Sequence, residues 1–344
     1  MNHPGWADAI RTYYEQKNQI WFQGGAGLSR MVASFRVHGC QEALLWYQRL
    51  ARRRRTVLQS VTRVDTRRVR RQLTNGPGDP KSQKPASARL STEKLWVDVL
   101  EHVQLLYRTG EDVGEERRIY PWRLALLPAG GTWRVVEERP LNDADRAVWG
   151  TSPQEQEGKS ADRAPGWWRE RWRKLFSFRR FDRLQVFKYA ELWWDGYNPR
   201  FRAFRVDCTN FVSQCLWHGG FPMEPAERPE QGWWYAWKEG GEDRWSLSWA
   251  VSHSLYWYMV QKAREGKVRF VDLPGRLYVG DIILYDWNGD GTWQHAAVVV
   301  DFDPEGQPLV NAHTTASYHR LWDYGDSPAW TRETRYAFIH IEDG

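Results

Sequence analysis

The chain has 344 residues, of which 41% are hydrophobic and 27% charged, so it is not disordered overall, and its length predicts two domains of ~100–200 residues each. No apolar run approaches the ~18 residues of a membrane-spanning helix, the polar start MNHPGWADAIRTYYEQ does not predict a secretory signal peptide, and three cysteines are too few for a disulfide scaffold. The net charge of +6 leaves an anionic partner open, but no zinc-finger spacing, glycine-rich phosphate loop or RNA-binding aromatic signature accompanies it, so nucleic acid is not expected.

Helices followed by long strands are expected in residues 1–142. Apolar residues recur at helical spacing in 6–22 and 41–51. The residues that follow predict strands at 56–73, 95–107, 118–127 and 133–138, a connector at 75–87 and turns at 109–116 and 128–131. This order predicts an α+β domain. It resembles the cone-shaped folds of the nuclear-transport-factor and cystatin type, and the role of the domain stays open.

The basic charge is concentrated in one stretch of this first domain. Nine arginines and one acid, Asp65, lie between Arg52 and Arg71. Such a run is either a solvated surface or a patch for an anionic polymer, such as nucleic acid or an acidic cell-surface polymer. We favour the solvated surface and keep binding of an anionic polymer as the alternative.

A change of composition separates the two predicted domains. Residues 142–166 lose their apolar periodicity and gain Asp, Gln, Ser and Pro, which is typical of a linker. The stretch WWRERWRKLFSFRRF (167–181) predicts a basic amphipathic helix that packs on a neighbour or lies on a membrane surface. We therefore expect a linker and basic helix at 143–178, and a second domain at 179–344.

A candidate nucleophile opens a helix of the second domain. A first helix is expected over 182–194, and DCTNFVSQCLWHGG (207–220) predicts another, with Asp207 as its N-cap and two glycines as its stop. Cys208 would lie in the first turn, where the helix dipole and free N–H groups favour a thiolate and can stabilise an oxyanion. The alternative role for Cys208 is a buried structural cysteine. Cys215, two turns further on, is expected in the core.

A base and an orienting residue can come from strands downstream. Strands are expected at 281–285 and 294–301, with His295 near the start of the second. On a third strand, Asn311 and His313 are two residues apart and should face the same side. A cysteine on a helix, a histidine on a strand and a polar residue on the next strand could form a Cys–His–polar triad.

Residues 181–325 resemble the putative amidase domain family of Gram-positive bacteria, which is related to NlpC-type and CHAP-type cell-wall peptidases. The resemblance rests on Tyr189-Ala190, Tyr197-Asn198-Pro199, DCTNFVSQCLWHGG, Pro222-Met223, Ser248-Trp249, Gly280-Asp281-Ile282-Ile283, His295 with its apolar strand and Asn311-Ala312-His313-Thr314. It implies a papain-like fold with Cys208 as nucleophile, His295 as base, and His313 or else Asn311 as third residue. Supporting or substrate-binding roles are expected for Asp207, Asn210, Trp249 and Gln294.

The resemblance also implies an activity, which is hydrolysis of an amide through a thioester, on a peptide or amide of the bacterial cell wall, with peptidoglycan as a possible partner. Two alternatives stay open: a non-catalytic module that binds a wall fragment or protein, and an acyltransferase that uses the same triad. No leader is visible, so localisation is left open between the cytoplasm and export.

Two further features have structural interpretations. Asp286–Gly291 fits the start of a calcium loop, but the twelfth position, which should be Glu, is Ala297. We expect a hairpin turn there, and no metal or cofactor. The tryptophan-rich stretch 233–257 is either core and cleft wall or an aromatic groove for an extended ligand.

Overall fold

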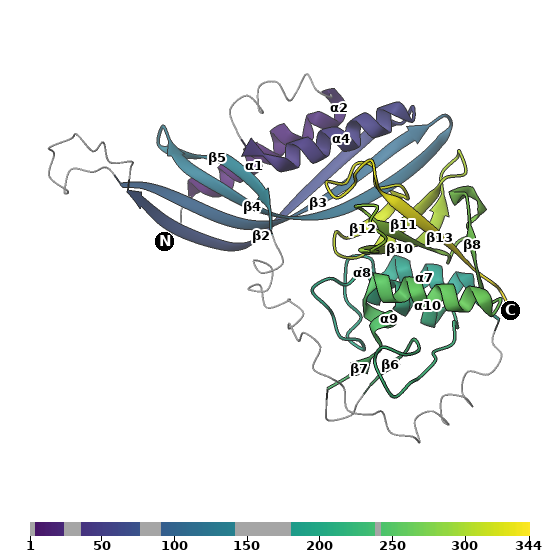
Figure 1. The fold of residues 1–344 in the computed structure, drawn as a ribbon. Coiled ribbons are helices and arrows are strands. Elements are labelled where there is room, and N and C mark those ends of the chain that lie inside the picture. The colour runs from purple at the N-terminus through teal and green to yellow at the C-terminus, as the bar shows by residue number, and fades with distance from the viewer. Residues whose placement is uncertain (1–3, 24–35, 76–90, 142–179, 238–241) are drawn as a thin grey trace. The chain divides into compact units, whose positions relative to one another are not determined.

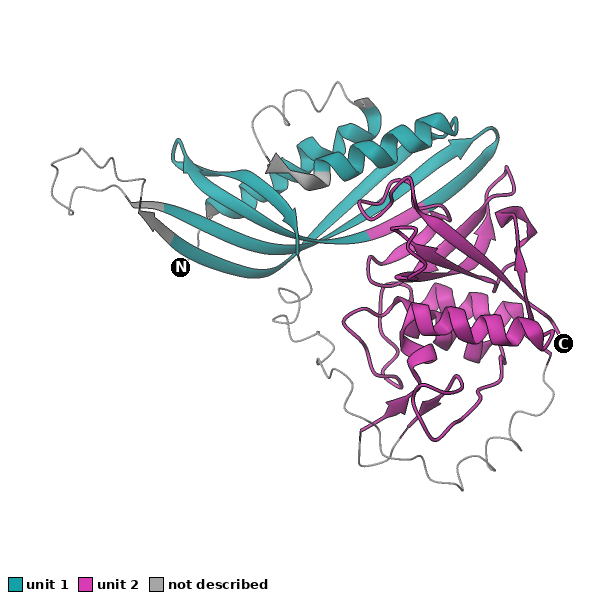
Figure 2. Ribbon diagram, in the orientation of Figure 1, with its two compact units in different colours: residues 1–115, 119–149 teal, residues 116–118, 150–344 magenta. Residues whose placement is uncertain are grey.

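The computed structural model describes residues 4–23, 36–75, 91–141, 180–237 and 242–344. It divides into two compact units, one of residues 1–115 and 119–149 and the other of residues 116–118 and 150–344 (Figure 2). Both units combine helices with largely antiparallel sheet, so the predicted α+β class is confirmed. The predicted linker at 142–166 lies outside the described residues, as does the basic helix at 167–181 except for its last two residues.

Unit 1 packs helices against a sheet of long antiparallel strands (Figure 1). Its helices are α1 (Pro4–Asn18), α2 (Ile20–Gln23) and α4 (His38–Arg52). Its strands are β1 (Arg36–Val37), β2 (Thr56–Asn75), β3 (Ser91–Thr109), β4 (Asp112–Ala129) and β5 (Thr132–Pro140). The turn predicted at 109–116 is present but shorter than expected, because β3 and β4 extend until only Gly110 and Glu111 separate them.

In unit 2, helices lie on six antiparallel strands. The helices are α7 (Arg183–Trp193), α8 (Cys208–His218), α9 (Leu247–Ala250) and α10 (Ser252–Arg264), with a 3₁₀ turn η2 (Pro274–Arg276). The order of the sheet is β12 (Ser317–Leu321), β11 (Pro308–Ala312), β10 (His295–Phe302), β9 (Ile282–Asp286), β13 (Arg335–Ile341) and β8 (Val268–Val271). A short ribbon pairs β6 (Tyr235–Ala236) with β7 (Arg244–Trp245).

The alternation of side chains along β10 separates two cores in unit 2. Ala296, Val298 and Val300 join the core that contains residues of α7, α8 and α10. Ala297 and Val299 join a second core on the opposite face of the sheet. Because successive side chains of a strand point to opposite faces, the first residue of β10 shares the face of Ala297.

The helices of the described residues are all too short or too polar to cross a membrane.

Candidate active site

Cys208 is the first residue of α8, as the sequence predicts. Asp207 precedes it at the N-cap position, but its side chain does not cap the helix. One carboxylate oxygen, Oδ1, instead accepts hydrogen bonds from the backbone N–H of Phe204 at 2.7 Å and the amide of Asn210 at 2.9 Å. Asp207 therefore fixes the loop that leads into the helix and a residue of its first turn.

The Cys208 thiol is surrounded by hydroxyl and amide groups. Its Sγ lies 3.9 Å from the hydroxyl oxygens of both Thr209 and Ser252, and the Ala296 backbone and the Thr314 side chain also lie near it and lower its pKa. The residue is 1% exposed. Burial raises the pKa of the Cys208 thiol, and these hydrogen bonds only partly oppose the rise.

Thr314, in the turn between β11 and β12, has a strained backbone. Its φ of 81° lies in the left-handed region, which costs free energy for a β-branched residue. Such strain persists only where the surrounding structure imposes it, and here the side chain contacts the Cys208 thiol. No sequence pattern predicts that Thr209, Ser252 and Thr314 lie near the thiol. Ser252 and Thr314 are far from Cys208 in the sequence.

His295 lies on the other face of the sheet, inside an aromatic box. Its ring centroid is 5.3 Å from that of Tyr285, 5.8 Å from Trp287 and 5.2 Å from Tyr324. The ring Nε2 is buried without a hydrogen-bond partner. Burial, and then the positive charge of Arg320, lower the pKa of His295 from 6.5 to about 3, so the ring is neutral near neutral pH.

The expected hydrogen bond between Cys208 and His295 is therefore not formed among the described residues. The physical reason is the alternation of β10: the backbone of Ala296 reaches the thiol, so its neighbour His295 points to the opposite face. The catalytic role of His295 stays a prediction.

His313 contacts Asp207 instead of His295. Its Nδ1 lies 2.7 Å from Asp207 Oδ2, its Nε2 lies 2.7 Å from the Trp193 carbonyl oxygen, and its ring stacks on Phe211 with centroids 4.1 Å apart. Both partners are hydrogen-bond acceptors, so both ring nitrogens must donate for both bonds to form. In this arrangement the His313 ring and the Asp207 carboxylate form a buried, closely paired contact beside the start of α8.

Asn311 lies on the same side as His313, as predicted, since both reach α7. Its amide donates to the Ala190 carbonyl at 3.3 Å and to Glu191 Oε1 at 2.9 Å, while its own oxygen accepts from the backbone N–H of His319. These contacts hold β11 and β12 against α7 and give Asn311 no role as an orienter of His295.

The residues expected to support the site form two separate networks. Trp249 donates from its indole to Asn210 Oδ1 at 2.8 Å, and Asn210 in turn donates to Asp207 and to the Arg202 carbonyl. Gln294 belongs to the hairpin before β10, where its side-chain oxygen accepts from the backbone N–H of Trp287 at 2.8 Å. The first network orders the loop and helix around Cys208, and the second orders the approach to His295.

The Asp286 turn and the tryptophan-rich stretch also have structural roles. The Asp286 carboxylate accepts from the backbone N–H groups of Gly289 and Gly291 at 2.8 Å, as in a tight hairpin turn. In the described residues no group of three or more His, Cys, Asp or Glu side chains could hold a metal ion.

Trp233 and Trp249 are core residues, whereas Trp257 is 58% exposed. Cys215 is buried in the core, as predicted.

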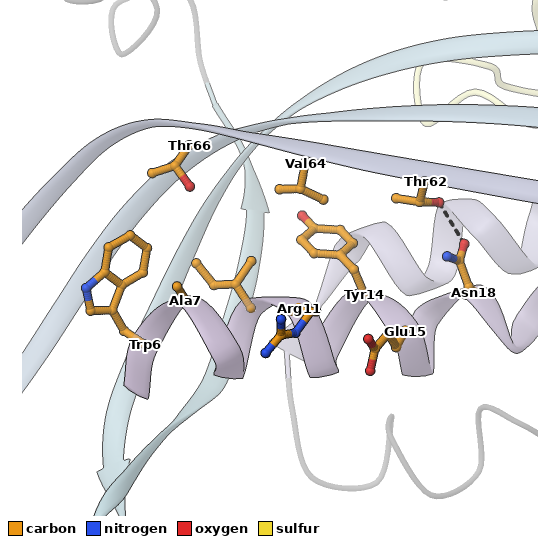
Figure 3. A pocket seen from close by; sticks show the side chains of 10 residues that line it. Trp6, Ala7, Arg11, Tyr14, Glu15, Asn18, Thr62, Val64 and Thr66 are labelled. Carbon is orange, nitrogen blue, oxygen red and sulfur yellow. Dashed lines mark hydrogen bonds between the residues drawn. The ribbon is translucent and has the colours of Figure 1, made fainter. Parts of the chain in front are cut away.

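Unit 1 contains a hollow of about 390 Å³ between α1 and β2 (Figure 3). It is lined by Trp6, Ala7, Ile10, Arg11, Tyr14, Glu15, Asn18, Thr62, Val64 and Thr66.

The Tyr14 hydroxyl donates to Glu138, which with Glu101 binds the buried ammonium of Lys17. Burial alone would lower the pKa of Lys17, but the two carboxylates raise it overall. No sequence pattern indicated this cluster.

The arginine-rich stretch lies at the end of α4 and along β2. Exposed arginines of β2 form ion pairs with neighbouring acids, for example Arg70 with Asp98 and Arg71 with Glu93, both at 3.4 Å. Arg55 is buried, and its guanidinium lies 4.6 Å from the ring centre of Tyr107. Binding of an anionic polymer by this stretch stays a prediction.

Residues 180–339 match the family model described as "Putative amidase domain". The uncharacterized protein YhbB of Bacillus subtilis (strain 168) is 42% identical over 163 residues, which cover 47% of this chain and 51% of YhbB. The chain thus spans about half the length of this curated relative. No solved structure matches it significantly. The family match coincides with the described part of unit 2 and suggests a hydrolase that acts on amides.

Proposed function

We propose that unit 2 is a cysteine-dependent amide hydrolase with Cys208 as its nucleophile. The observation that carries the proposal is the position of Cys208 at the first residue of α8, with backbone and hydroxyl groups gathered around its sulfur. A helix start favours the thiolate over the thiol, and free N–H groups of the first turn can bind the oxyanion that forms on a carbonyl.

The reaction then follows the general course of thiol catalysis. The thiolate attacks the amide carbonyl carbon, the C–N bond breaks, and the amine leaves with a proton from the general acid. Water next attacks the thioester, which releases the carboxylic acid and restores the thiol. If an amine replaced water in the second step, the same site would act as an acyltransferase.

We retain His295 as the base in this proposal. Its Nε2 has no hydrogen-bond partner and its low pKa keeps the ring neutral, but the ring must move to the Cys208 face of the sheet to receive the proton. The described arrangement would then be the resting state, in which the thiol is protonated. For His313 we propose a positioning role, since its contacts are with Asp207 and α7.

The substrate class that we propose is a peptide or amide of the bacterial cell wall, on the strength of the sequence resemblance to an amidase family. A second candidate function, a non-catalytic module that binds such a fragment, is favoured by one observation. Cys208 is fully buried, and its contacts among the described residues are hydroxyl and backbone groups rather than an imidazole.

The test is amine release from isolated Gram-positive cell-wall peptides by the full chain. Cys208→Ser should lower the rate at least ~10³-fold, because a serine hydroxyl is far less acidic than a thiol, and the buried control Cys215→Ser should retain most activity. Binding of the peptides without amine release, in wild type and variant alike, would favour the binding module. Equal rates in wild type and Cys208→Ser would reject Cys208 as nucleophile.

A further inference from the structure

Two hydroxyls from different parts of the chain meet at the Cys208 sulfur. Thr209 follows Cys208 in α8, whereas Ser252 is the first residue of α10. Their oxygens are 2.7 Å apart, and each lies 3.9 Å from the Cys208 Sγ. All three residues are buried, with exposures of 1% for Cys208 and Thr209 and 4% for Ser252.

The hydrogen count of this cluster limits what it can do. Each hydroxyl has one proton, and a 2.7 Å contact between the two oxygens uses one of them. The other proton is left for the sulfur. When the sulfur carries its own proton, the S–H can donate to a hydroxyl oxygen, and when the sulfur is ionised the direction reverses by rotation of the hydroxyls.

We propose that Thr209 and Ser252 together act as a single hydrogen-bond donor to the Cys208 thiolate. The pair transfers no proton: the proton of the thiol leaves to the general base or to water, and the hydroxyls only reorient toward the negative sulfur. This donor offsets part of the cost of a charged sulfur at a site with almost no exposure to solvent. This role for Thr209 and Ser252 rests on the proposed function, in which Cys208 is the nucleophile.

A shared donor predicts a particular pattern among variants. In Ser252→Ala or Thr209→Val, the remaining hydroxyl is free to turn to the sulfur, so one donor is kept. Only the double variant removes it. Two independent donors would instead give two single effects whose sum equals the effect of the double variant.

The experiment is a pH titration of the chain labelled with ¹³Cβ-cysteine, whose three cysteine resonances are assigned with Cys→Ser variants. The double variant should move the midpoint of Cys208 upward by about one pH unit, a tenfold change in ionisation constant. Each single variant should move it by less than half as much. At a fixed pH below the midpoint, kcat/KM should fall about tenfold in the double variant alone, and it should recover as the pH rises.

Two controls keep the test decisive if a variant folds poorly. Ser213→Ala removes another buried hydroxyl of α8, which donates to the Trp249 carbonyl, and should leave the midpoint unchanged. Thr209→Ser in the Ser252→Ala background should behave as Ser252→Ala does.

Three results would overturn the shared donor: an unchanged midpoint in the folded double variant, additive single shifts, or an equal shift from Ser213→Ala. A non-additive shift together with full hydrolysis by Cys208→Ser would support the donor pair and reject the proposed function instead.

Discussion

At Cys208, burial and hydrogen bonding act in opposite directions on one thiol. Desolvation raises its pKa, while the Ala296 backbone and three hydroxyls lower it in part. The sequence indicated the helix start, which favours the thiolate, but not the depth of burial, which depends on how α10 and the turn after β11 pack around the sulfur. Position along a helix is a local property, whereas desolvation is set by remote segments.

The aromatic box around His295 predicts a loss of stability in acid. The folded ring has a pKa of about 3 against 6.5 in the unfolded chain, so only the unfolded state binds a proton between these values. The contribution of the neutral His295 ring to the free energy of unfolding is fully present above pH 6.5. It falls by up to ~1.4 kcal/mol per pH unit as the pH drops toward 3. His295→Phe should therefore show a shallower decline of unfolding free energy between pH 6.5 and 4.5, measured by urea unfolding.

The matched control for this prediction is Tyr285→Phe, which changes one wall of the box and leaves His295 in place. It should keep the slope of the wild type. The prediction is wrong if His295→Phe also declines as steeply as the wild type. That result would place a charged His295 in the folded state, as in a thiolate–imidazolium pair with Cys208.

At the scale of elements, the sequence predicts the positions of helices and strands more accurately than the direction in which a single side chain points. The apolar spacing of 6–22 and the Asp-Cys start at 207 gave α1, α2 and α8 within a few residues. The strand at His295 was also correct, but its face was not, since both faces of β10 are buried and apolar. A strand buried on both sides lacks the polar alternation that would show which residues face the helices.

The turn between β11 and β12 carries a second prediction at this scale. Thr314 is held at φ 81°, a conformation that costs ~1–3 kcal/mol for a non-glycine residue. Thr314→Gly should relieve this strain. Glycine loses more conformational entropy on folding, at a cost of ~0.5–1 kcal/mol, which is no larger than the strain, so the variant should be at least as stable as the wild type. Loss of the hydroxyl contact with Cys208 should still reduce hydrolysis.

Thermal unfolding measures the stability of the variants, and amine release measures their hydrolysis of the cell-wall peptides. Thr315→Gly is the control, because it introduces glycine at the next position, where φ is not positive, and it should only destabilise. A clear loss of stability in Thr314→Gly, equal to that of Thr315→Gly, would show that the backbone at residue 314 is not strained.

At the scale of the whole molecule, the chain divides into two compact units. The boundary predicted at 143–178 lies almost entirely outside the described residues and stays a prediction. The family match, which ends at residue 339, is confined to the second unit. What the sequence did not show in the first unit is the buried Lys17–Glu101–Glu138 cluster. Its members come from three separate elements, and none stands out from the charged residues around it.

The division predicts that residues 180–344 fold alone. Two buried cores, one on each face of its sheet, are made from residues of this range. The fragment should unfold cooperatively in a circular dichroism melt and give a dispersed amide spectrum. Limited proteolysis of the full chain should cut first within 143–166, where the composition is typical of a linker. An uncooperative melt, or first cleavage between residues 208 and 313, would contradict the division.

Attack of Cys208 on an amide carbonyl would leave an acyl-enzyme, which can be captured. The full chain is mixed with Gram-positive cell-wall peptides, quenched in acid within the first turnovers, digested and analysed by mass spectrometry. We expect an acyl group on the peptide that contains Cys208, released by hydroxylamine as a thioester and absent from Cys208→Ser. Amine release with no adduct at Cys208, or an adduct on another residue that persists in Cys208→Ser, would contradict it.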